Sequence, residues 1–315
     1  MNYLKTYGQI FLKGVAMGGA DVVPGVSGGT IAFITGIYER LLKAISSFDA
    51  DALQHLLKFR WKALWQHVDG AFLTALLSGI LLSILTLAKV IHYLLDHHPI
   101  QLWSFFFGLV IIASYMVAKE ITEWNGRVII AGIAGIAIAF FITQATPAET
   151  PTGLWFIFLS GALAICAMIL PGISGSFILL ILGKYAYILE AVNERDLAVI
   201  AVFAIGCVIG LLSFSRLISW LLDRYYNTAI ALLAGFMVGS LNKIWPWKEV
   251  VSTRMNSDGE EVPFITQNVL PGQYTEVMGE PSYLGQAILF MIIGLGIVLV
   301  LDRVAARQQR ITKSA

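Results

Sequence analysis

Charged residues and cysteine are scarce in this 315-residue chain. Asp, Glu, Lys and Arg make up only 13% of the residues and the formal net charge is +1, so no broad basic surface indicates nucleic acid as a partner. The only two cysteines, Cys166 and Cys207, both lie inside apolar runs, which excludes a disulfide framework and a CxxC metal site. We therefore expect no nucleic acid, no metal and no organic cofactor.

What the chain has in excess is apolar sequence. Hydrophobic residues make up 57% of it and the mean hydropathy is +0.77, values typical of an integral membrane protein. Stretches near the roughly 20 residues that a helix needs to cross the hydrocarbon layer predict six membrane spans. They fall at about 71–95, 101–118, 128–144, 198–222, 228–245 and 284–301.

Two further apolar regions, 8–42 and 154–190, are too long for one crossing. Each is interrupted near its middle, by Pro24-Gly25 in the first and by Pro171-Gly172 in the second. Proline removes a backbone donor and clashes with the preceding helical turn, so we expect a helix break at both places.

The two breaks belong to an internal repeat. A shift of 147 positions, from Pro24 to Pro171, also superimposes Gly, Ser, Ile and Tyr positions that follow the break. Further along, a shift of 127 positions matches "AKVIHYLLD" at 88–96 with "SRLISWLLD" at 215–223. The sequence thus predicts two homologous halves, 1–150 and 151–315.

Charge placement predicts how the halves lie in the membrane. The region after the first break and the carboxyl-terminal tail are both rich in Lys and Arg, which predicts that both are cytoplasmic. With six full spans, each broken element must then enter and leave on one side, as a re-entrant hairpin. Three spans per half is an odd number, so the second half is inverted. The predicted fold is an all-α polytopic membrane protein with two inverted repeats, each a re-entrant broken-helix hairpin plus three transmembrane helices.

Two segments lie outside these spans. The segment at about 50–68 carries apolar residues at helical spacing beside tryptophans and cations, which predicts an interfacial amphipathic helix, although an ordinary solvated loop is the alternative. The loop 246–283 has "NSDGEE" between β-prone runs and predicts a small extracytoplasmic hairpin.

The chemistry of the breaks is that of an anion site. After each break a new helix begins with small and hydroxyl residues, whose free amides and positive dipole end attract a phosphate or a carboxylate. The candidate binding residues are Ser27, Gly28, Gly29 and Thr30 in the first copy and Ser174, Gly175 and Ser176 in the second. The alternative is that the glycines only allow tight helix packing.

Charged residues near the breaks are further candidates. Asp21 precedes Pro24 and has Met168 as its counterpart, and a lone carboxylate at membrane depth suggests a proton or sodium site, or else a helix cap. Glu39, Arg40 and Arg216 are candidate contacts for an anionic headgroup, although long cationic side chains near helix ends also extend to the interface without binding a ligand.

At "GGADVVPGVSGGTIAFITGIYERLL" and "PGISGSFILLILGKY" the sequence closely resembles the PopT family of bacterial polyprenyl-phosphate transporters, formerly a membrane family of unknown function. The resemblance covers nearly the whole chain. It implies a protein of the bacterial cytoplasmic membrane, not an enzyme, that returns undecaprenyl phosphate from the outer to the inner leaflet. The paired family motifs correspond to residues 21–30 and 171–176.

Three alternatives remain open. Helix amino termini also recognise carboxylates, so a carrier of a small soluble anion is one. "GVSGG" fits the G-x-S-x-G pattern of hydrolases, with Ser27 as nucleophile, but it follows no strand and no histidine is evidently near it. A structural assembly factor without a ligand is the third. The sequence does not indicate the oligomeric state or the coupling ion.

Overall fold

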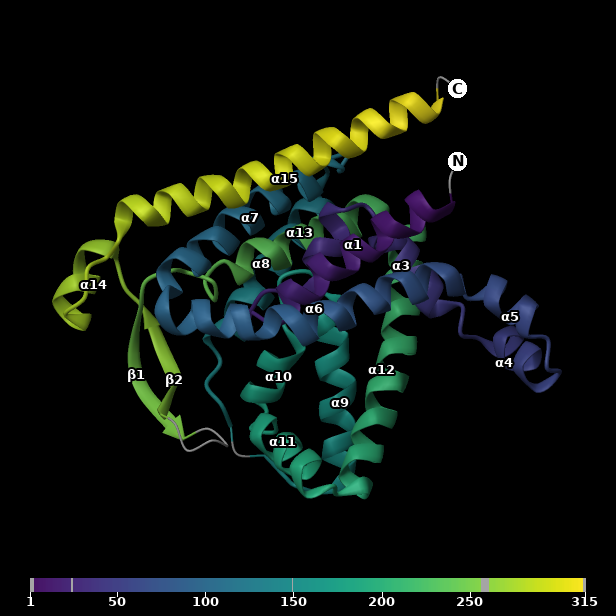
Figure 1. Ribbon diagram of the computed structural model, residues 1–315, viewed down its shortest axis with the longest axis horizontal. Coiled ribbons are helices and arrows are strands. Elements are labelled where there is room, and N and C mark those ends of the chain that lie inside the picture. The colour runs from purple at the N-terminus through teal and green to yellow at the C-terminus, as the bar shows by residue number, and fades with distance from the viewer. Residues whose placement is uncertain (1–2, 24, 149, 256–260, 314–315) are drawn as a thin grey trace.

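The computed structural model describes residues 3–23, 25–148, 150–255 and 261–313 (Figure 1). The first half contains α1 (Tyr3–Asp21), α2 (Gly28–Ile34), α3 (Tyr38–Ser46), α4 (Ala50–Leu57), α5 (Trp61–His67), α6 (Gly70–His97), α7 (Pro99–Lys119) and α8 (Gly126–Gln144). The second contains α9 (Leu154–Ile169), α10 (Gly175–Ile181), α11 (Tyr185–Glu194), α12 (Leu197–Arg224), α13 (Tyr226–Ser240), β1 (Lys248–Met255), β2 (Glu261–Asn268), α14 (Pro271–Met278) and α15 (Leu284–Lys313).

The long apolar stretches are helices, as the sequence predicts. By length and composition, α6, α7, α8 and α12 are each able to cross a membrane, and they are 19 to 28 residues long. The remaining two expected spans are shorter in the described part of the chain, because α13 has 15 residues and the apolar part of α15 covers Leu284–Val300. The chain is therefore a nearly all-helical, multi-pass membrane protein.

Both long apolar regions are broken, and in the same way. Glycine has a positive φ at each break, 88° at Gly25 and 92° at Gly172, a backbone conformation that other residues rarely adopt. A seven-residue helix follows each break, and α10 and α11 then meet at an angle of 103°. Pro24 lies outside the described residues. Figure 1 shows α1 and α9 converging on the centre of the molecule from different directions.

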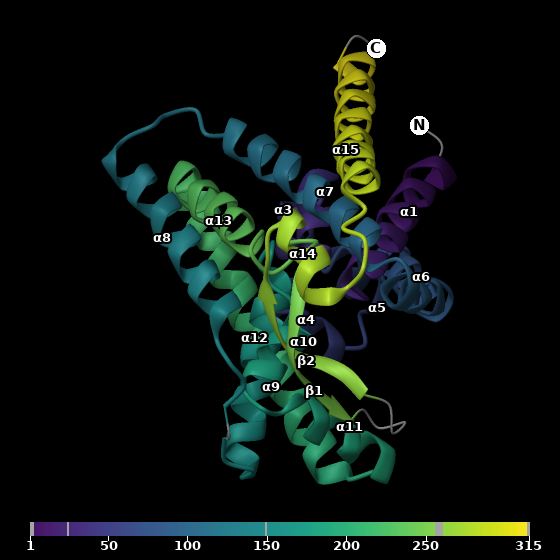
Figure 2. The ribbon, with the colours of Figure 1, turned by 90° about the vertical axis from the view of Figure 1, so that its left-hand side faces the viewer.

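The two halves interlock through their later helices. α15 of the second half packs along α7 of the first (Figure 1), and α13 of the second half packs along α8 of the first (Figure 2). The helix backbones touch at glycines: a Cβ on Gly108 would lie 2.1 Å from the Met291 carbonyl oxygen, and one on Gly135 would lie 2.3 Å from that of Leu232. Such close approach is how small residues join membrane helices. The halves predicted from sequence therefore do not pack as two separate bodies.

The segments outside the spans agree only in part with the sequence. Residues 50–68 form two short helices, α4 and α5, instead of one continuous helix, because Phe59 adopts a left-handed conformation with φ 53°. The loop 246–283 contains the expected strand pair: β1 and β2 are antiparallel, with Lys248 opposite Asn268. That the hairpin is extracytoplasmic stays a prediction. Helix α14 follows it, which the sequence did not indicate.

The main hydrophobic core surrounds the two breaks. Val23 and Val26 of the first break and Ile169 and Ile173 of the second belong to one cluster of buried side chains. This packing holds both breaks at the centre of the helix bundle.

Candidate functional site

The two helix breaks are in direct contact. The buried Ser27 hydroxyl lies 3.1 Å from the carbonyl oxygens of both Met168 and Leu170, so it can donate its proton to either. In the other direction, the Gly172 amide donates to the Thr30 hydroxyl at 3.0 Å. We call these bonds, which join segments more than 140 residues apart, the break junction.

The first three amides of α2 already have acceptors in this arrangement. Asp21 Oδ1 accepts a hydrogen bond from the Gly28 amide at 2.6 Å, and Ser27 Oγ accepts from the Gly29 amide at 3.1 Å. The Thr30 amide donates to the Ser27 carbonyl at 2.9 Å. The anion at this helix terminus is therefore the carboxylate of Asp21, in the position where the sequence suggested a phosphate or a cap.

The start of α10 differs because Met168 stands where the first copy has Asp21. The hydroxyls of Ser174 and Ser176 bond to each other at 2.8 Å, and within the described chain no protein acceptor meets the amides of Gly175 and Ser176. Ser174 and Gly175 are buried, whereas Ser176 is exposed. The second break thus keeps donors that the first has already used.

Ser176 opens into a large cavity, which we call the hairpin-side cavity. It has a volume of about 1040 Å³ and lies between α10–α11, the α6–α7 corner, and the β1–β2 hairpin with α14. Aromatic and aliphatic side chains form much of its wall. Its charged lining residues include Lys243 and Lys248, two residues that the sequence reasoning missed. The sequence feature that could have indicated these two lysines is the segment 242–248, "NKIWPWK", in which cations and tryptophans directly follow a span.

A second cavity, the α3-side cavity, has a volume of about 790 Å³. Its lining includes Glu39 and Arg40, two of the headgroup candidates. The Arg40 guanidinium is already paired, because it donates to both carboxylate oxygens of Asp69, at 2.6 and 3.1 Å, and lies over the Phe72 ring. The two cavities use equivalent repeat positions, since Tyr38 lines this one and Tyr185 lines the other.

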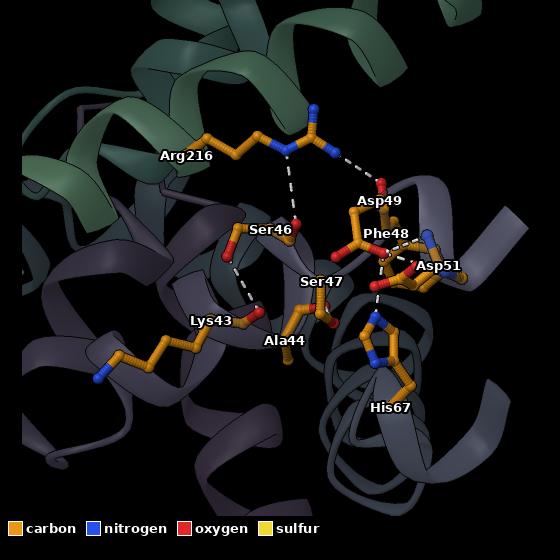
Figure 3. Close-up of polar contacts among 10 residues, drawn as sticks. Lys43, Ala44, Ser46, Ser47, Phe48, Asp49, Asp51, His67 and Arg216 are labelled. Atoms are coloured by element: carbon orange, nitrogen blue, oxygen red, sulfur yellow. Dashed lines mark hydrogen bonds and ion pairs between the residues drawn. The ribbon is translucent and has the colours of Figure 1, made fainter. Parts of the chain in front are cut away.

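Arg216 is placed differently from the other headgroup candidates. Its guanidinium donates to the Phe48 carbonyl at 2.7 Å and approaches the Ser46 carbonyl at 3.5 Å (Figure 3). In the same view Asp49 bonds to His67 at 3.0 Å. Arg216 therefore ties α12 to the carboxyl end of α3, and it is not among the residues that line either cavity.

A polytopic helical protein in which two broken helices meet beside a cavity has the architecture of a secondary transporter. Comparison with known families identifies this chain further: it belongs to the undecaprenyl phosphate translocase-like family, whose model matches residues 17–262. This confirms the family resemblance seen in the sequence. That family is one of transporters and not of enzymes.

Two known proteins are similar in sequence to most of this chain. A polyprenyl-phosphate transporter of Vibrio cholerae serotype O1 is 47% identical over 312 residues, which cover 98% of each chain. A polyprenyl-phosphate transporter of Staphylococcus aureus is 34% identical over 253 residues, 75% of this chain and 85% of the relative. No solved structure matches.

Proposed function

We propose that this protein moves undecaprenyl phosphate from the outer to the inner leaflet of the bacterial cytoplasmic membrane, with both termini in the cytoplasm. The family and both relatives support a polyprenyl phosphate as the cargo. The structural observation that carries the proposal is the hairpin-side cavity, where the open donors of the second break meet a mainly apolar wall.

The cargo has two parts with different needs. Its phosphate monoester carries about −1.5 to −2 charges at pH 7 and three strong acceptor oxygens, so it needs donors and positive charge. Its isoprenoid chain is apolar and can stay in the lipid through a lateral opening between helices. We place the phosphate first at Ser174, Gly175 and Ser176, because this end keeps free donors and opens to the cavity.

The first break is the second place for the phosphate in this proposal. Ser27, Gly28, Gly29 and Thr30 become available only when the break junction opens and Asp21 leaves the Gly28 amide. The Asp21 carboxylate and the phosphate therefore compete for the start of α2. Protonation of Asp21 would weaken its hold there, and this is how a proton gradient could be coupled to transport.

In this proposal the break junction closes the path between the two cavities, and opening the junction would connect them. Because α7–α15 and α8–α13 interlock the halves, we place the motion in the pairs α1–α6 and α9–α12, which carry the breaks. In this proposal the two halves do not rock against each other as rigid bodies. Glu39 and Arg40 would then meet the phosphate on the α3 side, after Arg40 exchanges Asp69 for the phosphate.

The test is lipid transfer by the purified protein in liposomes. Undecaprenyl phosphate is incorporated in both leaflets, the outer-leaflet phosphate is removed by an impermeant phosphatase, and the remaining pool is followed. The protein should make the inner pool accessible, whereas protein-free liposomes should retain it. Equal protection with and without the protein would refute the proposal.

The same preparation separates the alternatives. A hydrolase would release inorganic phosphate without added phosphatase, but Ser27 donates to backbone carbonyls, which leaves it poorly placed as a nucleophile. A carrier of small anions would take up inorganic phosphate into the lumen.

A further inference from the structure

Two lysines stand at the junction between α13 and the hairpin. Lys248, the first residue of β1, donates through Nζ to the Lys243 carbonyl at 2.6 Å, and its ammonium lies 3.8 Å from the centre of the Trp103 ring. The Lys243 ammonium lies 4.3 Å from the centre of the Phe177 ring. Aromatic faces therefore hold both cations in the wall of the hairpin-side cavity.

In the part of the chain that the structure describes, neither ammonium forms an ion pair. Within the described residues, no carboxylate lies within 4 Å of either one, although Asp96 and Glu280 also line the cavity. The α3-side cavity differs, because its Arg40 is paired with Asp69. Two partly buried like charges without a counter-ion are unfavourable.

The unfavourable surroundings of the two ammonium groups lower the pKa values of both lysines. Burial lowers the pKa of Lys243, and burial together with the nearby Lys243 ammonium lowers the pKa of Lys248 well below its usual value. A bound dianion would offset the repulsion and favour the protonated form of both lysines. The cavity is thus arranged for a ligand that carries negative charge.

Lys243 also touches both breaks. A Cβ on Gly25 would lie 2.9 Å from Lys243 Cγ, so the aliphatic stem of the lysine packs against the first break. Its ammonium lies over Phe177, which directly follows Ser176 of the second break. A ligand held by this lysine would therefore be next to the free donors of α10.

We propose that Lys243 and Lys248 form a phosphate-receiving site in the hairpin-side cavity, specific for the monophosphate head of a prenyl lipid. The inference rests on the proposed function and adds the residues that capture the cargo. Two ammonium groups match the charge of a phosphate monoester, and Ser176 supplies a hydroxyl donor beside them. The apolar and aromatic wall suits the first isoprene units, which free phosphate lacks.

The experiment uses the full chain in lipid nanodiscs. We would measure binding of farnesyl phosphate, inorganic phosphate and farnesol to the wild type and to Lys243→Gln, Lys248→Gln and the double variant. Losing one charge-assisted contact should weaken farnesyl phosphate binding roughly tenfold or more, and the double variant should lose more. Farnesol should bind weakly and equally to all of them. Lys119→Gln, which removes an exposed lysine outside the cavity lining, should bind like the wild type.

Conservative variants separate binding from folding. Lys243→Arg and Lys248→Arg keep the charge and should retain most of the affinity, whereas Lys248→Met keeps an apolar contact with Trp103 and should lose it. A Lys248→Met protein that melts like the wild type but binds farnesyl phosphate tenfold less would support the proposal.

Two results would overturn the proposal. One is that both glutamine variants bind farnesyl phosphate as the wild type does. The other is that inorganic phosphate binds as tightly as farnesyl phosphate with the same lysine dependence, which would make this a free-phosphate site. If the lysines bind the lipid but the protein does not move it in liposomes, the inference stands and the proposed function fails. If transfer occurs and the glutamine variants bind and transfer normally, only the inference fails.

Discussion

The break junction gives the sharpest prediction, because the two repeats supply a matched pair of serines. Ser27 and Ser174 occupy equivalent positions, 147 residues apart, and both precede a seven-residue helix. Their hydroxyls have different partners. Ser27 bonds to the Gly29 amide and to the carbonyls of Met168 and Leu170 at the end of α9, whereas within the described chain Ser174 bonds only to the exposed Ser176. Ser27→Ala and Ser174→Ala should therefore differ in stability.

The magnitude follows from the groups left without partners. Ser27→Ala leaves the Gly29 amide and one carbonyl of α9 unpaired at a site that is 0% exposed. Each such buried group costs about 1–3 kcal/mol, so for two groups we expect a loss of about 2–6 kcal/mol in the free energy of unfolding. Ser174→Ala leaves only the exposed hydroxyl of Ser176, which water can satisfy, and should cost about 0–1 kcal/mol.

The assay is thermal unfolding of both variants in the same detergent, followed by tryptophan fluorescence and by circular dichroism. The Tm of Ser27→Ala should fall by several degrees, while that of Ser174→Ala stays close to the wild type. Equal Tm values for the two variants would refute the reasoning, because they would mean that the Ser27 bonds across the junction contribute no net stability. Farnesyl phosphate binding should show the opposite order, with the larger loss in Ser174→Ala.

Three further predictions concern coupling, pH and packing. Asp21→Asn should make lipid transfer in liposomes independent of an imposed proton gradient while folding is retained, and unchanged gradient dependence would remove Asp21 from the coupling. Farnesyl phosphate affinity should rise with pH as the phosphate loses its second proton near pH 6 and fall again at alkaline pH. The fall should begin below the usual lysine pKa, because burial lowers the pKa of Lys243 and Lys248; a flat alkaline limb in a binding titration would contradict this. Gly294→Ala should lower the Tm by several degrees, because its Cβ would lie 2.1 Å from the Phe105 carbonyl oxygen, whereas Gly296→Ala on the same helix meets nothing within 4 Å and should leave the Tm unchanged.

Whether a helix or a break could be predicted from the sequence depended on how strongly a few neighbouring residues determine the backbone there. Glycine at the breaks and long apolar runs elsewhere act through the backbone of a few neighbouring residues, so the helices and both breaks were predictable. The segment 50–68 was predicted wrongly as one helix, because neither Gly nor Pro marks the left-handed turn at Phe59. Helix α14 was not predicted, because its eight residues are too few to show an amphipathic repeat.

Composition and backbone preference act through single residues and their near neighbours, so the sequence alone was enough to predict a membrane protein and both helix breaks. The duplication stays a prediction from internal similarity. Which partners the polar groups at the breaks bond to became visible only once the helices were packed together. Ser27 bonds to the end of α9, the Lys243 ammonium lies over Phe177 and the Lys248 ammonium lies over Trp103, because segments distant in sequence pack together. A pattern of residues can show that a donor is present, but whether the donor is free for a ligand depends on which distant group the fold places against it.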